Sequence, residues 1–263
     1  MIHIGTSGYS YEDWVGPFYP KDVVKREWLA FYTREFSTVE INFTYYRLPD
    51  ARTLQAMAAK TPEGFLFTIK ASQELTHARE DNAQAFAQFV QALDPVIAKQ
   101  RFGCVLAQFP FSFHPNSENQ DYLRTFRERM GDLPVVIEFR HAGWLSSPTF
   151  SLLRENNLGF CCVDEPRLKG LLPPVAEATS SIAYVRFHGR NAQKWWQHEA
   201  KGPGTSREAW QRYNYTYSRQ ELEQWVPKIR ELDAKAQHTY VFANNHWQGQ
   251  AVDTARQLRL LLA

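Results

Sequence analysis

Residues 134–144, PVVIEFRHAGW, contain the side chains in this chain that point most directly to chemistry. The stretch begins as an apolar, β-branched run and ends in a carboxylate, a guanidinium, an imidazole and an indole: Glu138, Arg140, His141 and Trp144. A buried strand that becomes polar at its carboxyl end indicates a site at the edge of a sheet. Glu138 and Arg140 are two residues apart, so their side chains share one face of the strand.

Other strand-like runs end in the same way. Glu40 with Asn42, and Arg186 with His188, repeat the spacing of two, and single polar residues end four further runs: Lys70, Gln108, Asp164 and Asn244. If these faces point inward, seven strands deliver polar groups to one place. Three carboxylates, three cations and a histidine are the groups that general acid–base catalysis uses, and shared burial is expected to move their pKa values apart.

The runs that carry these residues alternate with helical patterns, which is typical of βα units and a parallel sheet. Strands are predicted over residues 2–6, 38–42, 65–70, 103–109, 159–164, 182–188 and 239–244, with an eighth within 134–144. Helices are predicted near residues 24–34, 51–60, 82–99, 119–130, 148–156, 219–236 and 251–262. Eight such units in about 250 residues predict a TIM (β/α)8 barrel, whose active sites lie at the carboxyl ends of the strands. The rival doubly wound sheet usually begins with GxGxxG, and GTSGYS lacks it. We therefore expect one α/β domain over residues 1–263.

The connection after the seventh predicted strand is unusually long, aromatic and basic. Its aromatic residues are Trp195, Trp196, Trp210, Tyr213, Tyr215 and Tyr217, and its basic residues are Arg190, Lys194, Lys201, Arg207, Arg212 and Arg219. Loops of this length are usually functional or disordered, and the aromatic side chains argue against disorder. We interpret the connection as a lid or pocket wall. A solvated loop or a nucleic-acid surface would also explain its basic residues.

The strand-end residues divide into two expected roles. The titratable ones are candidates for catalysis: Glu40, Lys70, Glu138, Asp164 and His188. The others, with aromatic residues near the mouth, are candidates for substrate binding: Tyr9, Asn42, Tyr46, Gln108, Arg140, Trp144, Arg186 and Asn244. The competing interpretation is a self-satisfied network of ion pairs, because buried charges need partners. The aromatic residues have an equally ordinary alternative, which is capping the barrel as core.

These residue types leave several functions open. The first is acid–base chemistry on a small anionic or polyhydroxylated substrate by a hydrolase, isomerase or lyase. Lys70, Arg140 and Arg186 would hold the anion, with Glu138 or Glu40 as base and His188 or Asp164 as partner acid. A Schiff base on Lys70 is a variant of it. The second is metal-assisted chemistry on a sugar or phosphodiester, with Mn²⁺, Mg²⁺ or Zn²⁺ held by Glu40, Glu138, Asp164 and His188. The third is a non-catalytic binding protein or a nucleic-acid-associated protein. Neither a metal nor any other cofactor is specified.

Bulk composition narrows the class of protein. Hydrophobic residues make up 44% and charged residues 22% of the chain. These fractions are typical of globular proteins, and the formal net charge of +2 gives no strong field toward nucleic acid or an anionic membrane. No apolar run approaches the roughly 20 residues of a membrane-spanning helix, and the first residues lack a signal-peptide pattern. Cys104, Cys161 and Cys162 lie in apolar runs and are expected to be buried thiols. A cytoplasmic enzyme with a small-molecule substrate is the expectation.

Taken in order, the strand ends resemble the YecE-like family, also called domain of unknown function 72. The matching segments are IGTSGYSYEDWVGPFYP, VEINFTYYRLP, FLFTIKAS, VLAQFPFSF, VIEFRHAGW, VDEP, YVRFHGR, YNYTYSRQELEQW and YVFANNHWQGQA. They extend from Ile4 to Ala251, and the chain departs from the expected pattern at Gly143 and Ala243. The resemblance implies a TIM barrel and supplies no reaction, so function must be argued from the site.

Overall fold

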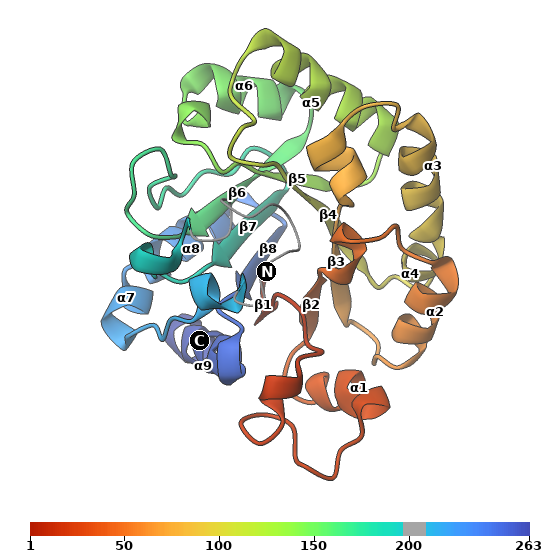
Figure 1. Ribbon diagram of the computed structural model, residues 1–263, viewed down its shortest axis with the longest axis vertical. Helices are drawn as coiled ribbons and strands as arrows, with labels where there is room; N and C mark the ends of the chain where they lie inside the picture. Colours follow the sequence, from red (N-terminus) through yellow and green to blue (C-terminus); the bar gives the residue numbers. More distant parts are fainter. Residues whose placement is uncertain (197–208) are drawn as a thin grey trace.

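A ring of eight parallel strands forms the centre of the molecule (Figure 1). The computed structural model describes residues 1–196 and 209–263. Its strands run in the order β1-β8-β7-β6-β5-β4-β3-β2. Their bounds are β1 (Ile2–Thr6), β2 (Thr38–Ile41), β3 (Leu66–Lys70), β4 (Phe102–Gln108), β5 (Val135–Glu138), β6 (Leu158–Asp164), β7 (Ile182–Phe187) and β8 (His238–Ala243). All eight predicted strands are present, which confirms the TIM-like α/β architecture.

The ring comes together between β1 and β2, the two ends of the sheet order. Ser7 and Glu40 form a parallel bridge there, and the Gly8 amide donates to the Glu40 carbonyl at 2.8 Å. A Cβ atom on Gly5 would lie 2.2 Å from the Thr38 carbonyl oxygen, so this approach requires glycine. The sheet is therefore a nearly closed barrel, and the carboxyl ends of its strands meet at one mouth.

Helices surround the ring and cover its outer face (Figure 1). Their bounds are α1 (Trp28–Tyr32), α2 (Ala51–Ala59), α3 (Ala83–Ala92), α4 (Asp94–Ala98), α5 (Ser117–Met130), α6 (Ser147–Glu155), α7 (Arg219–Glu223), α8 (Val226–Lys235) and α9 (Gln250–Leu262). Local signals explain several starts: Asn116 and Ser146 cap α5 and α6 with their side chains, and Ser218 forms a capping box with Glu221 at α7.

Three predicted helices differ from the structure. The helix expected over residues 82–99 is divided into α3 and α4, and the one expected over 219–236 into α7 and α8. In both cases a proline, Pro95 or Pro227, lies in the first turn of the second helix, where its missing N–H costs nothing. The helix expected over 24–34 is limited to α1, preceded by a 3₁₀ turn.

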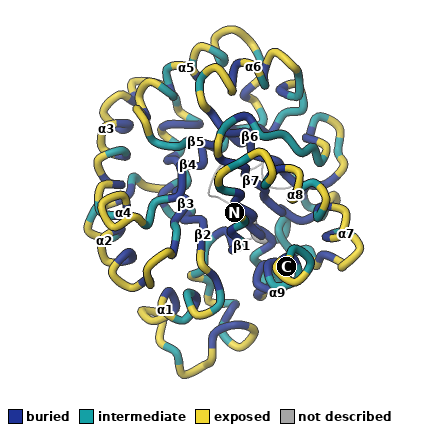
Figure 2. Tube along the Cα trace, turned by 180° about the vertical axis from the view of Figure 1, so that it is seen from behind, coloured by how far each residue is buried: buried dark blue, intermediate teal, exposed yellow. Residues whose placement is uncertain are grey.

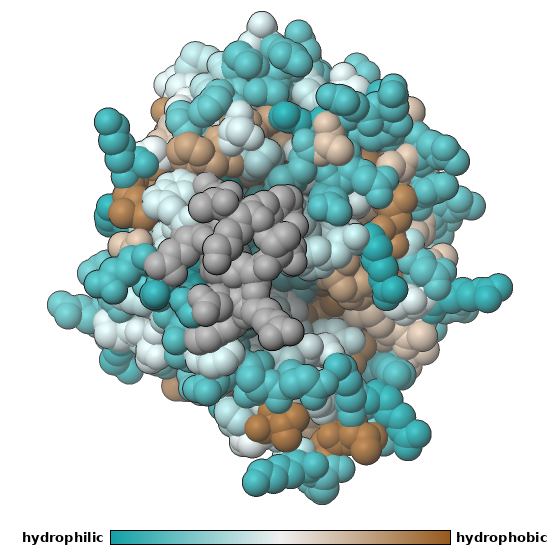
Figure 3. Space-filling view, viewed as in Figure 1, coloured by the Kyte–Doolittle hydropathy of each residue, from teal (hydrophilic) through white to brown (hydrophobic). Residues whose placement is uncertain are grey.

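Burial follows the barrel. Strand residues are almost all buried and exposed residues lie on the outer helices (Figure 2), which is the pattern of a parallel sheet covered on its outer face. The thiols of Cys104, Cys161 and Cys162 are buried and free, as predicted. One face of the molecule is mainly hydrophilic, with hydrophobic side chains in separate small groups (Figure 3). Among the described helices, none combines the length and the apolar character needed to cross a membrane.

Candidate active site at the barrel mouth

Arg186, near the end of β7, joins two glutamates from distant strands. Its Nη2 donates to Oε1 of Glu40 and its Nη1 to Oε2 of Glu138, both at 2.6 Å. The other Glu40 oxygen accepts from the Tyr184 hydroxyl at 2.7 Å. The side chains of both glutamates are completely buried and that of Arg186 is 2% exposed. The pair predicted between Glu138 and Arg140 is therefore part of a larger network.

Glu138 is the centre of that network. Its Oε1 accepts from Arg140 Nη2 at 2.9 Å and lies 3.1 Å from His188 Nε2. Burial opposes ionisation of this carboxyl, but Arg140 and Arg186 outweigh it and hold its pKa well below the usual range. Glu138 is therefore a permanent carboxylate, and both of its oxygens are occupied by cationic or N–H partners.

His188 is held as a neutral imidazole. Burial, followed by the repulsion of Arg140, lowers its pKa well below the usual value. Its Nδ1 lies 2.9 Å from Asn244 Nδ2 and its Nε2 faces Glu138. We assign the proton to Nε2, because a neutral ring can then donate to the carboxylate and accept from the amide.

Glu165 completes the second side of Arg140. Its Oε2 accepts from Arg140 Nη1 at 3.2 Å, and its Oε1 accepts from the Leu172 amide at 3.0 Å. Burial raises the pKa of Glu165 to about 7, against the opposing effect of Arg140. Sequence reasoning missed this residue because it lies one position beyond the predicted strand end, in the proline-rich connection.

Lys70, the last residue of β3, is the exception among the cations. Its Nζ donates to the neutral Oε1 of Gln108 at 2.9 Å and lies 4.5 Å from the ring centroid of Tyr45. Within residues 1–196 and 209–263 it forms no ion pair, whereas Arg140 and Arg186 each pair with two glutamates. Burial, with the repulsion of Arg186, lowers the pKa of Lys70 to about 7.

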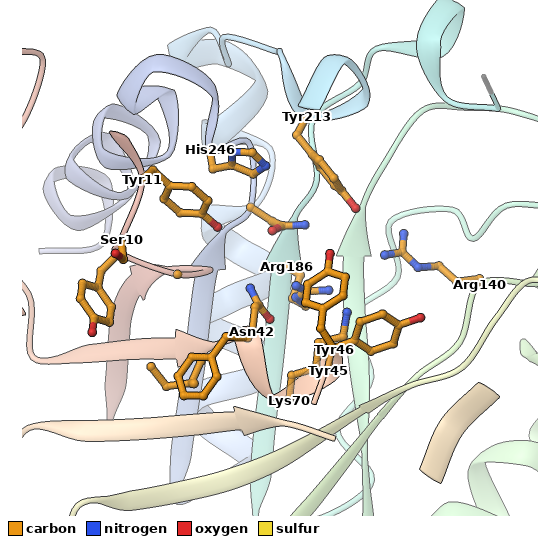
Figure 4. Close-up of a pocket in the computed structure, with 15 residues that line it drawn as sticks. Ser10, Tyr11, Asn42, Tyr45, Tyr46, Lys70, Arg140, Arg186, Tyr213 and His246 are labelled. Atoms are coloured by element: carbon orange, nitrogen blue, oxygen red, sulfur yellow. The ribbon is translucent and has the colours of Figure 1, made fainter. Parts of the chain in front are cut away.

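A cavity of about 610 Å³ lies above this network (Figure 4). Lys70 and Arg186 reach its wall from β3 and β7, Arg140 reaches it from just after β5, and tyrosines form much of the remainder. The lining residues are Gly8, Tyr9, Ser10, Tyr11, Ile41, Asn42, Phe43, Tyr45, Tyr46, Lys70, Arg140, Arg186, Tyr213, Asn244 and His246. Lysine and arginine side chains beside aromatic rings and hydroxyls can hold a small polar anion.

Three of the lining side chains have a buried polar atom without a hydrogen-bond partner among the described residues: Asn42 Oδ1, Arg186 Nε and His246 Nδ1. Buried polar atoms are usually paired, so unpaired ones along a cavity indicate positions for ligand contacts. His246 also stacks on Tyr11, with ring centroids 4.6 Å apart. The cavity thus offers donors, acceptors and stacking faces together.

The structure brings together most of the predicted site residues. Tyr9, Asn42, Tyr46, Lys70, Arg140, Arg186 and Asn244 line the cavity, and Gln108, Glu40, Glu138 and His188 contact them from beneath or beside. Further contributors were not among these candidates: Tyr11, Tyr45, Glu165, Tyr184 and His246, together with Tyr213 of the long connection. Tyr184 lies two residues before Arg186, so the face-sharing rule applied one step further would have found it.

The prediction that Asp164 belongs to the catalytic group at the mouth is wrong, because its side chain lies away from the cavity. Cys161 faces the barrel interior, where its Sγ is 3.9 Å from Glu138, and strand alternation then places Asp164 on the outer face. There its carboxylate accepts from Arg190 at 2.9 and 2.7 Å. It also accepts from Tyr217 and Trp225, both at 2.7 Å. Asp164 thereby ties the end of β6 to the connection after β7.

The prediction that Trp144 binds substrate at the mouth is also wrong. Its indole is completely buried, donates to the Phe113 carbonyl at 2.6 Å and stacks on Phe139 with centroids 4.3 Å apart. It does not line the cavity. Trp144 is therefore a core residue that caps the barrel and does not contact the cavity.

The long connection contributes one cavity wall through Tyr213, which lies in the 3₁₀ turn Ala209–Tyr213. Several of its basic residues are already engaged: Arg190 pairs with Asp164 and Glu221, and Arg219 pairs with Glu223. Lys201, Arg207 and the side chain of Trp210 lie outside the described residues. The interpretation as a pocket wall therefore has support at Tyr213.

The expected metal donors do not form a ligand set. Glu40 and Glu138 direct their oxygens at Arg186, and Asp164 lies on the opposite face of its strand. In the part of the chain that the structure describes, no three His, Cys, Asp or Glu side chains are grouped as metal ligands. These residues do not fit a divalent ion, so we derive no step through a metal.

Replacing Asp164 by Asn is expected to lower the free energy of unfolding by about 2 kcal/mol, because a buried carboxylate that accepts from three side chains loses its charge. Urea unfolding would measure the change. Asp121→Asn is the matched control, since its side chain is 73% exposed. An exposed pair such as that of Asp121 with Arg124 is worth under about 1 kcal/mol. If the Asp164→Asn variant keeps its stability but loses turnover, Asp164 has a catalytic role after all.

Comparison with known proteins gives a consistent family assignment. The family described as "Protein of unknown function DUF72" matches residues 3–263. The UPF0759 protein YunF of Bacillus subtilis is 34% identical over 274 residues, covering 100% of this chain and 95% of that protein. A crystal structure of a DUF72 family protein from Thermotoga maritima superimposes with a TM-score of 0.89 at 38% identity, over 100% of this chain and 99% of the other. An Enterococcus faecalis family member, with a TM-score of 0.85 at 24% identity over 100% and 95% of the two chains, shares the fold.

Proposed function

The chain belongs to the DUF72 family, and from that premise we propose that it is an enzyme that moves protons on a small anionic or polyhydroxylated substrate at the barrel mouth. The family description names no reaction, so the proposal rests on the site. The single observation that carries it is Lys70, a cavity-lining cation without an ion-pair partner in the described part of the chain. We assign Lys70 as the acid–base group.

The pKa of Lys70 supports this role. A catalytic group works best when its pKa lies near the working pH, because both protonation states are then populated. The pKa of Lys70 is lowered to about 7, first by burial and then by Arg186. An ordinary surface lysine would be almost fully protonated at that pH and a poor base.

The buried carboxylates support a different role from the one expected of them. Glu138 was the first candidate for the base, but its lowered pKa makes it a weak one and its oxygens already accept from Arg140, Arg186 and His188. We propose that Glu40 and Glu138 are positioning residues that fix the arginine planes. The guanidinium groups then attract an anion without having to reorganise.

Substrate recognition follows from the cavity wall. Arg140 and Arg186 supply positive charge toward a carboxylate or phosphate, for which guanidinium groups are suited. Asn42, His246 and Tyr213 supply polar atoms toward hydroxyl groups. A proton transfer next to a carbonyl, as in an isomerase or lyase, fits this arrangement best.

Proton exchange in D₂O tests the proposal even when the product is unidentified. We expect ¹H NMR to show loss of a C–H signal next to a carbonyl for at least one member of a panel of sugar phosphates and 2-oxo acids. Replacing Lys70 by Met should slow that exchange by about 100-fold or more, the size of a general base contribution. Lys235→Met is the matched control, because Lys235 pairs with Glu231 on the exposed side of α8.

A thermal-shift titration with the same panel separates the alternatives. Compounds that bind but never exchange would indicate the non-catalytic binding protein and overturn the proposed enzyme. Exchange that is equal in the Lys70→Met variant and in the unsubstituted protein would remove Lys70 from the mechanism.

The cytoplasm remains the proposed location. Three buried free thiols are compatible with a reducing compartment, where disulfides are rare. Nucleic acid receives less support as a partner, because Arg190 and Arg219 of the long connection are paired with acidic side chains.

A further inference from the structure

We propose that Lys70 forms a covalent imine with the carbonyl carbon of a substrate that also carries a carboxylate or phosphate. This inference rests on the proposed function and deepens it, because it names a substrate class and a covalent step. Four features of the site carry it: the placement of Lys70, its neutral hydrogen-bond partner, its aromatic neighbour and the nearby guanidinium groups.

The placement satisfies the first requirement for a nucleophilic amine, which is access to a substrate. Lys70 is the last residue of β3 and lines the cavity of about 610 Å³ (Figure 4), and it is the one lysine among the described residues that line it. Its neighbours at the wall include Ile41 and Phe43, which provide apolar surface. A desolvated lysine in such a setting is a typical Schiff-base former.

The contacts of Lys70 hold the amine without neutralising its reactivity. The Gln108 amide oxygen accepts from Nζ at 2.9 Å, and an amide oxygen stabilises the charged ammonium less than a carboxylate does. Tyr45 presents its ring at 4.5 Å and restricts the side chain from the other direction. The nearby carboxylates of Glu40 and Glu138 are instead committed to Arg186 at 2.6 Å. The carboxylates of the network thus pair with the arginines, and no counter-ion contacts the amine among the residues that the structure describes.

The arginines determine what else the carbonyl compound must carry. Arg140 and Arg186 line the same cavity as Lys70. Arg186 Nε is buried and has no hydrogen-bond partner in the described part of the chain, so one N–H of this guanidinium is unpaired. A carboxylate or phosphate attached near the carbonyl would be drawn toward these charges while the carbonyl carbon lies at Nζ. The shared chemistry is an anionic aldehyde or ketone.

The covalent step balances with water as the leaving group. The neutral Lys70 amine adds to the carbonyl carbon, so that a C–N bond forms and the π electrons move to oxygen. The oxygen takes one proton from the nitrogen and one from solvent and leaves as water. The protonated imine that remains withdraws electrons and favours loss of a proton from the adjacent carbon to solvent. In this step Lys70 acts through its covalent bond to the substrate and not as a free base. The lowered pKa of Lys70, about 7, supplies the neutral amine near neutral pH.

Reductive trapping tests the imine directly. The full-length protein is incubated at pH 7 with sodium cyanoborohydride and pyruvate, dihydroxyacetone phosphate or acetone, and the labelled lysines are identified by peptide mass spectrometry. We expect label from one of the two anionic compounds at Lys70, at least tenfold above that at Lys235, and little from acetone. Pyruvate and dihydroxyacetone phosphate distinguish a carboxylate from a phosphate as the anionic group.

The variants decide between the imine and its alternatives. Lys70→Met and Lys70→Arg should both lose the label, and Lys235→Met should keep it. Uniform labelling of all lysines, or acetone reacting as well as the anionic compounds, would overturn the inference. Proton exchange in D₂O without a trapped adduct would leave the proposed function standing and refute the imine. A trapped adduct at Lys70 without proton exchange would support the imine and overturn the proposed proton transfer.

Discussion

Replacing Arg186 by Met is expected to lower the free energy of unfolding by about 4 kcal/mol, because the buried Glu40 carboxylate loses its cationic partner and Glu138 loses one of two. Arg186 joins Glu40 and Glu138, whose side chains are completely buried. The Tyr184 hydroxyl would remain on Glu40, and Arg140 and His188 on Glu138. Urea unfolding followed by circular dichroism would measure the loss.

A rescue variant distinguishes buried charge from lost packing as the cause. Arg186→Met combined with Glu40→Gln and Glu138→Gln removes the cation and both carboxylates together, so most of the lost stability should return. Arg124→Met is the control for a generic arginine, since its pair with Asp121 lies on the exposed side of α5. Loss of such a pair should cost under about 1 kcal/mol. If the triple variant is no more stable than Arg186→Met, charge compensation is not the reason for this cluster.

Replacing Lys70 by Met is expected to have the opposite effect and to raise the free energy of unfolding at pH 7 by about 2 kcal/mol or more. A difference of one in pKa between the folded and unfolded states corresponds to about 1.36 kcal/mol. The pKa of Lys70 falls from 10.5 to about 7 on folding, and solvent that reaches the cavity reduces the full value. Stability gained together with activity lost is typical of residues kept for function.

The stability gained by replacing Lys70 with Met is expected to depend on pH. Because folding lowers the pKa of Lys70 from 10.5 to about 7, the unfolded chain binds more protons between these pH values, and stability rises with pH there. The destabilisation by Lys70 is therefore complete below pH 7 and disappears as pH approaches 10.5. The charged groups that face it, Arg186, Arg140, Glu138 and Glu40, affect this window.

Unfolding at pH 6 and pH 9.5 would check the difference between the Lys70→Met variant and the unsubstituted protein. The stability gain should be larger at pH 6. Lys235→Met provides the comparison, since its side chain is 54% exposed and no such pH-dependent gain is expected. A gain of equal size at both pH values would mean that Lys70 is not desolvated in the folded protein.

Together the two predictions describe a site with divided roles. Glu40, Glu138 and Arg186 form a charge-compensated cluster. Arg140 bridges Glu138 and Glu165 beside it. Lys70 is the destabilised member that faces the cavity. Such a division, in which most charges are satisfied and one is not, is common where a protein trades stability for chemistry.

Much of this architecture is determined locally, and the sequence alone therefore predicted it. Apolar runs of strand length and their spacing depend on neighbours along the chain, so eight strands and the barrel were predicted. The period of two in a strand is also local, and it placed Glu138 with Arg140, and Arg186 with His188, on shared faces. Helix divisions at Pro95 and Pro227 were missed, although the prolines are local signals too.

What the tertiary structure alone decided is which faces point inward and which residues meet across the barrel. Arg186 reaches Glu138 over 48 positions and Glu40 over 146, and no local pattern specifies such pairs. Asp164 ends a strand like the others, yet alternation from Cys161 turns it to the outer face. Lys70 and Arg186 looked equivalent as isolated cations. In the closed ring Arg186 pairs with two carboxylates, whereas Lys70 donates to the neutral amide of Gln108. The register of the strands determines these partners at the mouth.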